Sequence, residues 1–172
     1  MNDKFLQYYF LGIGGIGMSA IARYFNAKGY AVGGYDRTET KLTNDLTAEG
    51  VEINYEESET VIPDRFRDAK KTLVVITPAV QSDHAQLEYF RNHNFKILKR
   101  CEILGQITRS SKAICIAGTH GKTTTSTMTA HLMHQSHVEC SAFLGGISNN
   151  YNTNLLISTQ SNFVVVEADE YD

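Results

Sequence analysis

The chain has 172 residues and a formal net charge of −3 at pH 7, with 42% hydrophobic and 20% charged residues. This is the balance of an ordinary globular protein, and the length allows one domain and part of a second. The slightly acidic charge argues against a nucleic-acid or membrane surface, and no segment reaches the length of a membrane span. Basic pairs such as Lys70-Lys71 and Lys99-Arg100 are expected to be solvated ends of loops or strands.

The three cysteines, Cys101, Cys115 and Cys140, have no paired spacing, so they are expected to be reduced thiols in a cytoplasmic protein. Cys115 lies inside an apolar run and is expected to be a small core residue. The first ten residues lack a basic region and a long apolar stretch, so no signal peptide is expected.

Strand-like and helix-like segments alternate through the first 110 residues. Strands are predicted over 7–12, 31–35, 51–55, 72–77 and 95–99. Helices are predicted over 15–28, 41–49 and 83–93 and in a stretch that runs through 107. The run 72–77 is β-branched and apolar on both faces, which is typical of a buried parallel strand. The alternation predicts an α/β fold with a Rossmann-like, doubly wound parallel sheet.

The polar segment 108–112 divides the chain, so a first domain over 1–110 and a second over 111–172 are expected. In the second, a strand is predicted over 113–118, a helix over 122–136 and a buried strand from 163. About 60 residues is small for a nucleotide-binding α/β domain. The chain also stops near the carboxyl end of a strand, where such sheets place their active sites. The second part is therefore expected to be the incomplete start of a P-loop ATPase domain.

Residues 12–17, with the sequence GIGGIG, match the pattern G-x-G-x-x-G between an expected strand and an expected helix. The four glycines, Gly12, Gly14, Gly15 and Gly17, allow the backbone to approach a diphosphate at the N-terminus of the helix. Asp36 follows the second strand, where an acid commonly meets a ribose hydroxyl. NAD, FAD and a UDP-sugar all carry a diphosphate, so the motif leaves these ligands open. A tight turn without a ligand is the alternative.

A second glycine-rich loop, GTHGKTT at 118–124, also lies between an expected strand and an expected helix. It is shorter than a standard P-loop, because Gly118 lies only three residues before Gly121. Lys122 is suited to bind phosphate oxygens, and the hydroxyl of Thr123 is suited to bind Mg²⁺. A polar helix cap is the alternative interpretation.

Acidic residues follow the last expected strand. They are Glu167, Asp169, Glu170 and Asp172. Acids at the end of a strand resemble the second metal-binding element of P-loop enzymes, with a solvated acidic tail as the alternative. The segment 77–80, which begins with Thr77, follows a buried strand at the same sheet edge as the first loop and is a candidate to line the diphosphate site, with a simple turn as the alternative. The histidines at 131, 134 and 137 lack further ligands at suitable spacing, so no metal site is expected there.

These motifs resemble the Mur ligase superfamily, in which the compact loop G-T-x-G-K-[ST] is normal. The His120 position, GIGGIGMSAIA at 12–22, TPAVQSDH at 77–84 and EADEYD at 167–172 resemble the branch that joins L-alanine to UDP-N-acetylmuramate. The likeness covers nearly the whole chain in the family's order. Ala20 and Tyr171 depart from the family, which commonly has glycine and serine there, and they leave local packing in doubt.

The resemblance implies ATP-dependent ligation through an acyl phosphate in peptidoglycan precursor synthesis, with ATP and Mg²⁺ as cofactors. The first loop and Asp36 would bind the UDP part of the substrate. The second loop is implied to bind ATP through seven residues, which are Gly118, Thr119, His120, Gly121, Lys122, Thr123 and Thr124. Lys122 and Glu167 are the implied catalytic residues, and Thr123 and Glu167 the implied metal ligands. The fragment alone is expected to be inactive, because the amino-acid domain and most of the ATPase domain lie outside it.

Competing interpretations remain at this point. An NAD(P)-dependent oxidoreductase would use the first loop alone, which leaves the second loop and residues 167–172 unexplained. A UDP-sugar-binding module without catalysis would use the first domain alone. Folylpolyglutamate synthases lack such a first domain, and the ligase that recycles muropeptides usually has a different first loop. The oligomeric state and the strictness of the amino-acid choice stay open.

Overall fold

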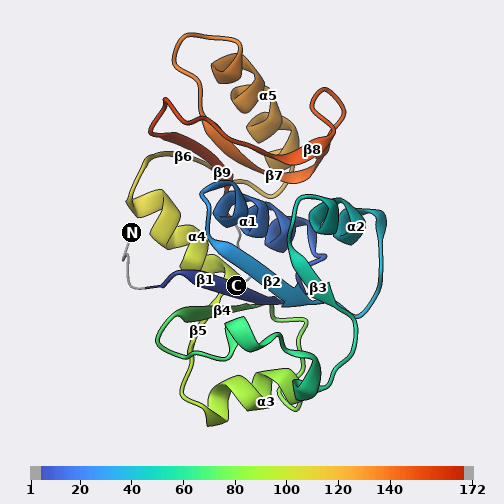
Figure 1. The fold of residues 1–172 in the computed structure, drawn as a ribbon. Helices are drawn as coiled ribbons and strands as arrows, with labels where there is room; N and C mark the ends of the chain where they lie inside the picture. Colours follow the sequence, from blue (N-terminus) through green and yellow to red (C-terminus); the bar gives the residue numbers. More distant parts are fainter. Residues whose placement is uncertain (1–4, 169–172) are drawn as a thin grey trace.

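The structure is a computed structural model that describes residues 5–168, and it contains two sheets with helices around them (Figure 1). The first sheet has five parallel strands in the order β3-β2-β1-β4-β5. The strands are β1 (Gln7–Leu11), β2 (Ala31–Tyr35), β3 (Glu52–Asn54), β4 (Thr72–Ile76) and β5 (Lys96–Lys99). The helices are α1 (Ile16–Ala27), α2 (Lys41–Ala48), α3 (Ala85–Asn92) and α4 (Arg100–Arg109), with short 3₁₀ turns at Glu59–Val61 and Asp64–Phe66.

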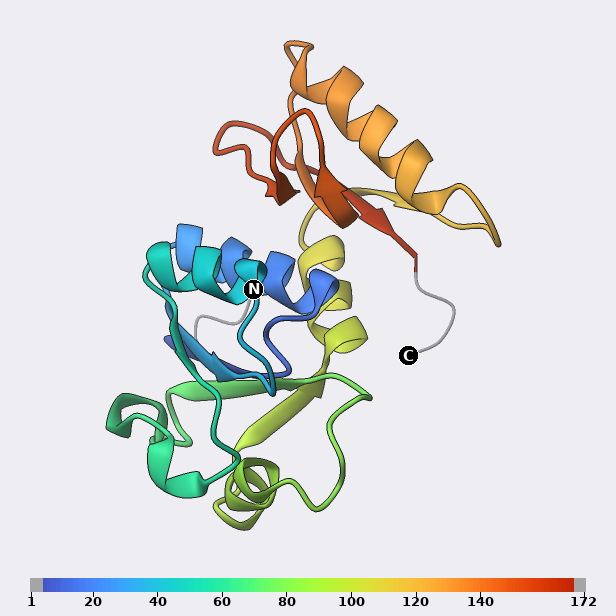
Figure 2. The ribbon, with the colours of Figure 1, turned by 90° about the vertical axis from the view of Figure 1, so that its right-hand side faces the viewer.

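Helices cover both faces of this sheet (Figure 2). Helices α1, α2 and α4 lie on the face toward the second sheet, while α3 and the 3₁₀ turns lie on the other face. The central strand β1 is therefore buried on both sides, and Phe10 and Tyr9 point to opposite faces with no exposed surface. The order of the strands reverses between β1 and β4, which creates a crevice at their carboxyl ends. The prediction of a doubly wound α/β fold is confirmed.

The second sheet is mixed and has the order β6-β9-β7-β8. Its strands are β6 (Lys112–Ile116), β7 (Ser141–Ser148), β8 (Thr153–Leu156) and β9 (Phe163–Glu167), and its helix is α5 (Lys122–His134). One face packs against α5 and the other against α1, with alternate residues of β7, such as Phe143 and Leu144, pointing to the two sides. The second unit therefore rests on the helix that carries the first glycine loop (Figure 1).

Most elements predicted in the first sheet appear within two residues of the expected boundaries. The hairpin of β7 and β8 was not predicted, because the glycines at 145 and 146 interrupt the apolar pattern of its first strand. The prediction that Cys115 is a core residue is wrong, because its side chain is exposed. Strand β6 is the edge strand of the second sheet, and nothing among the described residues covers Cys115.

Within residues 5–168, none of the helices combines the length and the apolar character that a membrane span needs.

Replacement of Phe10 by alanine tests the burial of β1. Phe10 has no exposed surface, so we expect the free energy of unfolding to fall by about 3–5 kcal/mol through lost burial and an internal cavity. Leu6→Ala is the matched control, because 57% of the Leu6 side chain is already exposed and its loss should cost little. Urea unfolding of both variants measures the difference. Equal losses in the two variants would contradict the packing described.

Candidate functional site

The first glycine loop is a tight turn that joins β1 to α1. Gly12 has a φ of +83°, which favours glycine, and the amides of Gly12 and Ile13 both donate to the carbonyl oxygen of Tyr35 at 2.8 and 3.0 Å. A side chain at Gly12 would have no room, because its Cβ would lie 2.6 Å from Cγ2 of Thr77. Helix α1 begins without a side-chain cap or an acidic residue in its first turn, so its N-terminus is suited to an anion.

Asp36 lies beside this loop, as the sequence predicted, but its carboxylate braces the loop itself. Its Oδ2 accepts the amide of Gly14 at 2.7 Å, and its Oδ1 accepts the amide of Thr38 at 3.2 Å. A Cβ at Gly14 would lie 2.8 Å from the same carboxylate, so only glycine fits this contact. Asp36 therefore fixes the backbone of the loop.

A cavity of about 360 Å³ opens at the carboxyl ends of β1, β2 and β4. Gly12, Asp36 and Thr77 contribute to its wall, so the structure brings these predicted residues together. His84 and Arg37 also line it, and the sequence analysis did not single them out. The ring of His84 packs edge-on against Tyr35, with 4.5 Å between the ring centroids.

The second loop turns sharply between β6 and α5. Gly118 and Gly121 have φ values of +144° and +77°, so both lie in the region that favours glycine. A Cβ at Gly121 would meet nothing within 4 Å, which leaves the outer face of the loop open. The amino group of Lys122 donates to the carbonyl oxygen of Gly118. Three further loop residues are exposed, and they are Thr119, His120 and Thr124.

Glu167, at the end of β9, faces the start of α5, as the sequence predicted. Its Oε2 accepts the hydroxyl of Thr123 at 3.2 Å. Its Oε1 accepts the hydroxyl of Ser126 and the amide of Gly145, each at 3.0 Å. A carboxylate and a hydroxyl are the hard oxygen donors that Mg²⁺ prefers, and the open loop beside them leaves room for phosphate oxygens. The arrangement therefore fits a magnesium–nucleotide.

Ser126 and Gly145 were missed by the sequence analysis. Ser126 is fully buried in α5 one turn after Thr123, so only the helical spacing within the threonine-rich run could have pointed to it. A Cβ at Gly145 would lie 2.6 Å from both carboxylate oxygens of Glu167. Position 145 must therefore be glycine if Glu167 is to keep this place.

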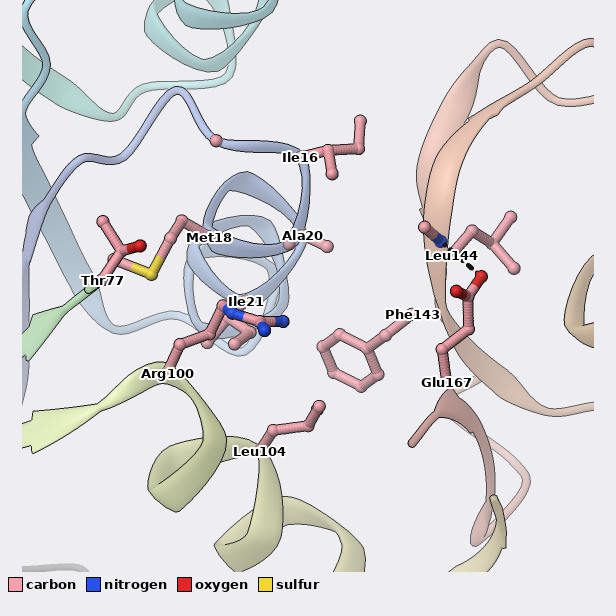
Figure 3. Close-up of a pocket in the computed structure, with 13 residues that line it drawn as sticks. Ile16, Met18, Ala20, Ile21, Thr77, Arg100, Leu104, Phe143, Leu144 and Glu167 are labelled. Atoms are coloured by element: carbon pink, nitrogen blue, oxygen red, sulfur yellow. Dashed lines mark hydrogen bonds between the residues drawn. The ribbon is translucent and has the colours of Figure 1, made fainter. Parts of the chain in front are cut away.

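A second cavity, also of about 360 Å³, lies between the two units (Figure 3). Gly15, Gly17 and Thr77 line it from the first unit, and Gly145 and Glu167 line it from the second. The first glycine loop and the Glu167 carboxylate thus border the same space. Figure 3 shows Glu167 across the cavity from Met18 and Arg100.

Arg100 is half-buried and lines this cavity, so the expectation that it is a solvated strand end is wrong. It opens α4, and its guanidinium packs against α1 so closely that a Cβ at Gly17 would lie 2.9 Å from its Nη1. Lys99, the other member of the pair, is exposed as expected.

The histidines of α5 and the acidic residues after β9 were the remaining candidates. His131 hydrogen-bonds to the hydroxyl of Tyr151 at 2.8 Å, and His134 packs against the same ring. Within residues 5–168, no three His, Cys, Asp or Glu side chains gather in a way that could hold a metal ion. The predicted candidates Asp169, Glu170 and Asp172 lie outside the described residues.

The comparisons with known proteins agree with this geometry. The model of a family described as "Mur ligase family, catalytic domain" matches residues 7–112. The UDP-N-acetylmuramate–L-alanine ligase of Phocaeicola vulgatus is 62% identical over 164 residues, which cover 95% of this chain and 36% of that protein. The enzyme of the same name from Porphyromonas gingivalis strain W83 is 58% identical with the same coverage.

Two solved structures are also similar. The UDP-N-acetylmuramate-alanine ligase of Thermotoga maritima matches with a TM-score of 0.84 and 32% identity, covering 95% of this chain and 37% of that one. The Neisseria UDP-N-acetylmuramate:L-alanyl-γ-D-glutamyl-meso-diaminopimelate ligase matches with a TM-score of 0.86 and 25% identity, covering 98% and 54%.

The fold and the two loops thus define a doubly wound α/β protein that carries a glycine-rich loop between a strand and a helix in each of its two units. More specifically, the chain belongs to the Mur ligase family, because the family model matches more than half of it. It spans only about a third of the length of the curated relatives it matches.

Replacement of Gly145 by alanine should disturb Glu167 without disturbing the fold. Because the new methyl group would lie 2.6 Å from the carboxylate, we expect a loss of about 10–100-fold in the ATP-dependent activity that is proposed below for the full-length protein. Gly146→Ala is the matched control, since its nearest contact would be 3.7 Å from Thr123 Cγ2. Steady-state kinetics at saturating magnesium measures both. Equal activities would show that Glu167 does not need its present position.

The stability of the chain should depend on pH through His84. Burial lowers the pKa of its imidazole, and Glu57 raises it by a smaller amount. Protonation therefore favours the unfolded chain, so the stability contributed by neutral His84 is complete above about pH 6.5 and is lost as the pH falls below it. Urea unfolding between pH 7.5 and 5 should show a smaller decline in His84→Asn than in the parent. The exposed His137→Asn should decline like the parent, and a His84→Asn decline as steep as the parent's would contradict this assignment.

Proposed function

We propose that this chain is the substrate-binding and ATP-loop part of a ligase that joins L-alanine to UDP-N-acetylmuramate at the expense of ATP, in peptidoglycan precursor synthesis in the cytoplasm. The observation that carries the proposal is the shared cavity, with the first glycine loop on one side and Glu167 on the other. A phosphate-binding loop and a metal-binding carboxylate that border one space would suit a reaction between two phosphate-bearing substrates. The relatives at 62% and 58% identity carry this activity in their names.

In the proposal, each of the two units, with its own sheet, binds one of the two phosphate-bearing substrates. Residues 1–110 would bind the UDP-substrate, and residues 111–172 would form the first part of the ATP-binding domain. Strand β5 and helix α4 complete the first unit, and β6 opens the second. The two units differ in sheet topology, which supports a boundary in the short link between Arg109 and Lys112.

On the substrate side, the amides of Gly15 and Gly17 and the N-terminus of α1 would hold the diphosphate, while the amide of Gly14 stays on Asp36. Gly12 would supply the tight turn and Asp36 would hold the loop in shape, with Thr77 in the wall between the two cavities. Asp36 was first expected to contact the uridine end of the substrate. This role stays part of the proposal, since Asp36 also lines the cavity that His84 lines.

On the ATP side, the second loop from Gly118 to Thr124 would surround the phosphates. Lys122 would exchange the carbonyl oxygen of Gly118 for phosphate oxygens. Thr123 and Glu167 would hold Mg²⁺, which offsets negative charge on the phosphates when it is bound. Ser126 and Gly145 would keep the carboxylate of Glu167 aimed at that position.

The chemistry then depends on positioning. The muramate carboxylate attacks the terminal phosphorus of ATP and gives an acyl phosphate and ADP, and the amine of L-alanine displaces phosphate from the acyl carbon. Lys122 stabilises charge on the transferred phosphoryl group, and the first glycine loop anchors the far end of the substrate. A large part of the rate gain would come from holding the carboxylate against the terminal phosphate inside the cavity between the units. The amino-acid pocket is not among the described residues.

The alternatives explain less of the structure. An NAD(P)-dependent oxidoreductase would use the cavity beside Gly12 and Asp36, but it would give the hydrogen bond between Thr123 and Glu167 no role in binding or catalysis. A UDP-sugar-binding module describes the expected behaviour of this chain alone, which we predict to bind the substrate without ligating it.

Calorimetric titration of the chain tests the proposal. We expect saturable binding of UDP-N-acetylmuramate and no binding of NADH. In Gly14→Ala a methyl group would displace Asp36, so the affinity should fall tenfold or more. In Gly105→Ala the new methyl group would meet only the flexible end of Arg109, so binding should be unchanged. Binding of NADH without the UDP-sugar would overturn the proposal in favour of an oxidoreductase.

A further inference from the structure

Helix α1 is buried on every side over most of its length. Each residue from Met18 to Phe25 is buried, including the polar side chains of Ser19 and Arg23. The helix packs on the first sheet through one face and on β7 and β8 through another. Its N-terminus carries the first glycine loop, so any shift of the helix against the second sheet also moves that loop.

A single buried amide joins this helix to the second sheet. Asn154, on β8, has no exposed surface. Its Nδ2 donates to the carbonyl oxygen of Ile16 at 2.6 Å and to the hydroxyl of Ser19 at 2.8 Å. Its Oδ1 accepts a hydrogen bond from Nη1 of Arg23. The amide thus uses both donors and its acceptor on one face of α1, over almost two turns.

The network continues to Glu49, which caps the C-terminus of α2. Nε of Arg23 donates to both carboxylate oxygens of Glu49, at 2.8 and 2.9 Å. The Arg23 side chain is only 10% exposed and the Glu49 side chain is 40% exposed, so the pair joins a buried guanidinium to a carboxylate at the surface. Arg23 is therefore fixed from both sides, and it presents its guanidinium to Asn154 in one geometry.

Apolar side chains surround this network in the interface. Tyr24 and Phe143 pack with 5.2 Å between their ring centroids, and Leu155, Val164 and Val166 join the same cluster. Apolar packing is non-directional, and it can accept small sliding movements. A buried amide whose three groups are all satisfied accepts only one register, because each lost bond leaves a polar group unpaired in the interior.

We propose that Asn154 is a positioning residue that fixes the register of α1 against the second sheet, and with it the distance between the two nucleotide loops. Asn154 holds the main chain of Ile16, inside the first glycine loop, and the side chains of Ser19 and Arg23 further along α1. It acts through these residues and touches no proposed substrate. The activity readout below rests on the proposed ligase function, whereas the distance readout does not.

The distance is measured on this chain by pulsed electron paramagnetic resonance. Spin labels are placed at the exposed positions of Asn44→Cys on α2 and Gln135→Cys after α5, with Cys101 and Cys115 replaced by serine. We expect one narrow distance distribution in this parent and a broadened or shifted one after Asn154→Ala. Asn150→Ala, an exposed asparagine in the preceding turn, is the matched control and should keep the parent distribution. An Asn154→Ala distribution identical to the parent's would overturn the proposal.

The activity is measured on the full-length protein. We expect Asn154→Ala to lower kcat at least tenfold, while KM for UDP-N-acetylmuramate and for ATP changes less than threefold, since no residue that would touch a substrate is replaced. The assay is run well below the melting temperature of the variant, so a merely structural role would leave kcat unchanged. Unchanged kcat together with an unchanged distance overturns the proposal, whereas a wild-type protein without ligase activity overturns only the proposed function.

A second variant guards against misfolding. Ser19→Ala combined with Asn154→Leu removes the amide and its hydroxyl partner together and fills the space with an apolar side chain of similar size. Arg23 keeps its pair with Glu49. This double variant should fold and show the same broadened distance as Asn154→Ala. A narrow parent-like distance in it would equally contradict the positioning role.

Discussion

The packing of α1 between two sheets is the constraint on which the rest of the structure depends. One face of the helix closes the core of the first sheet, and another forms the interface with β7 and β8. Its first turn carries the first glycine loop, and the cavity between the units opens beside that turn. A helix with a single buried face could have closed the first core, but it could not have set one loop opposite the other.

In the second unit, the position of the Glu167 carboxylate also depends on contacts between elements that are distant in the sequence. Glu167 reaches Thr123 only because Ser126 and the amide of Gly145 hold its other oxygen. These three partners come from α5 and β7, two elements that are joined by sheet packing and not by local sequence. The proposed metal site is therefore a product of tertiary structure, although its two ligands lie in recognisable motifs.

Much of the fold could be predicted from the sequence, for physical reasons that are local. The run 72–77 is apolar on both faces because β4 lies inside a parallel sheet covered on both sides. The loop at 12–17 could be recognised because the turn requires glycine at particular positions, such as Gly12 with its positive φ. Residues 18–25 are apolar almost all round, which is typical of a fully buried helix, but the pattern does not say what covers the second face.

The parts that could not be predicted depend on distant contacts. The hairpin of β7 and β8 carries little strand signal, and its place is set by pairing of β7 with β9. Cys115 has an apolar sequence context, yet it lies on an edge strand and is exposed. Arg100 and Asn154 act across the interface between the units, so neither their spacing nor their neighbours in the sequence mark them. Residue type alone did not distinguish them from solvated polar residues.

The central claim is that the two loops hold two substrates on opposite sides of one cavity. Paramagnetic relaxation tests it directly, with Mn²⁺ in place of Mg²⁺ and a non-hydrolysable ATP analogue bound to the full-length protein. The account predicts that the lactyl methyl protons of bound UDP-N-acetylmuramate relax faster than the uracil protons, because the lactyl carboxylate lies toward Glu167 and the uracil lies beyond the first loop. Uracil protons that relax as fast as the methyl protons, or faster, would contradict it.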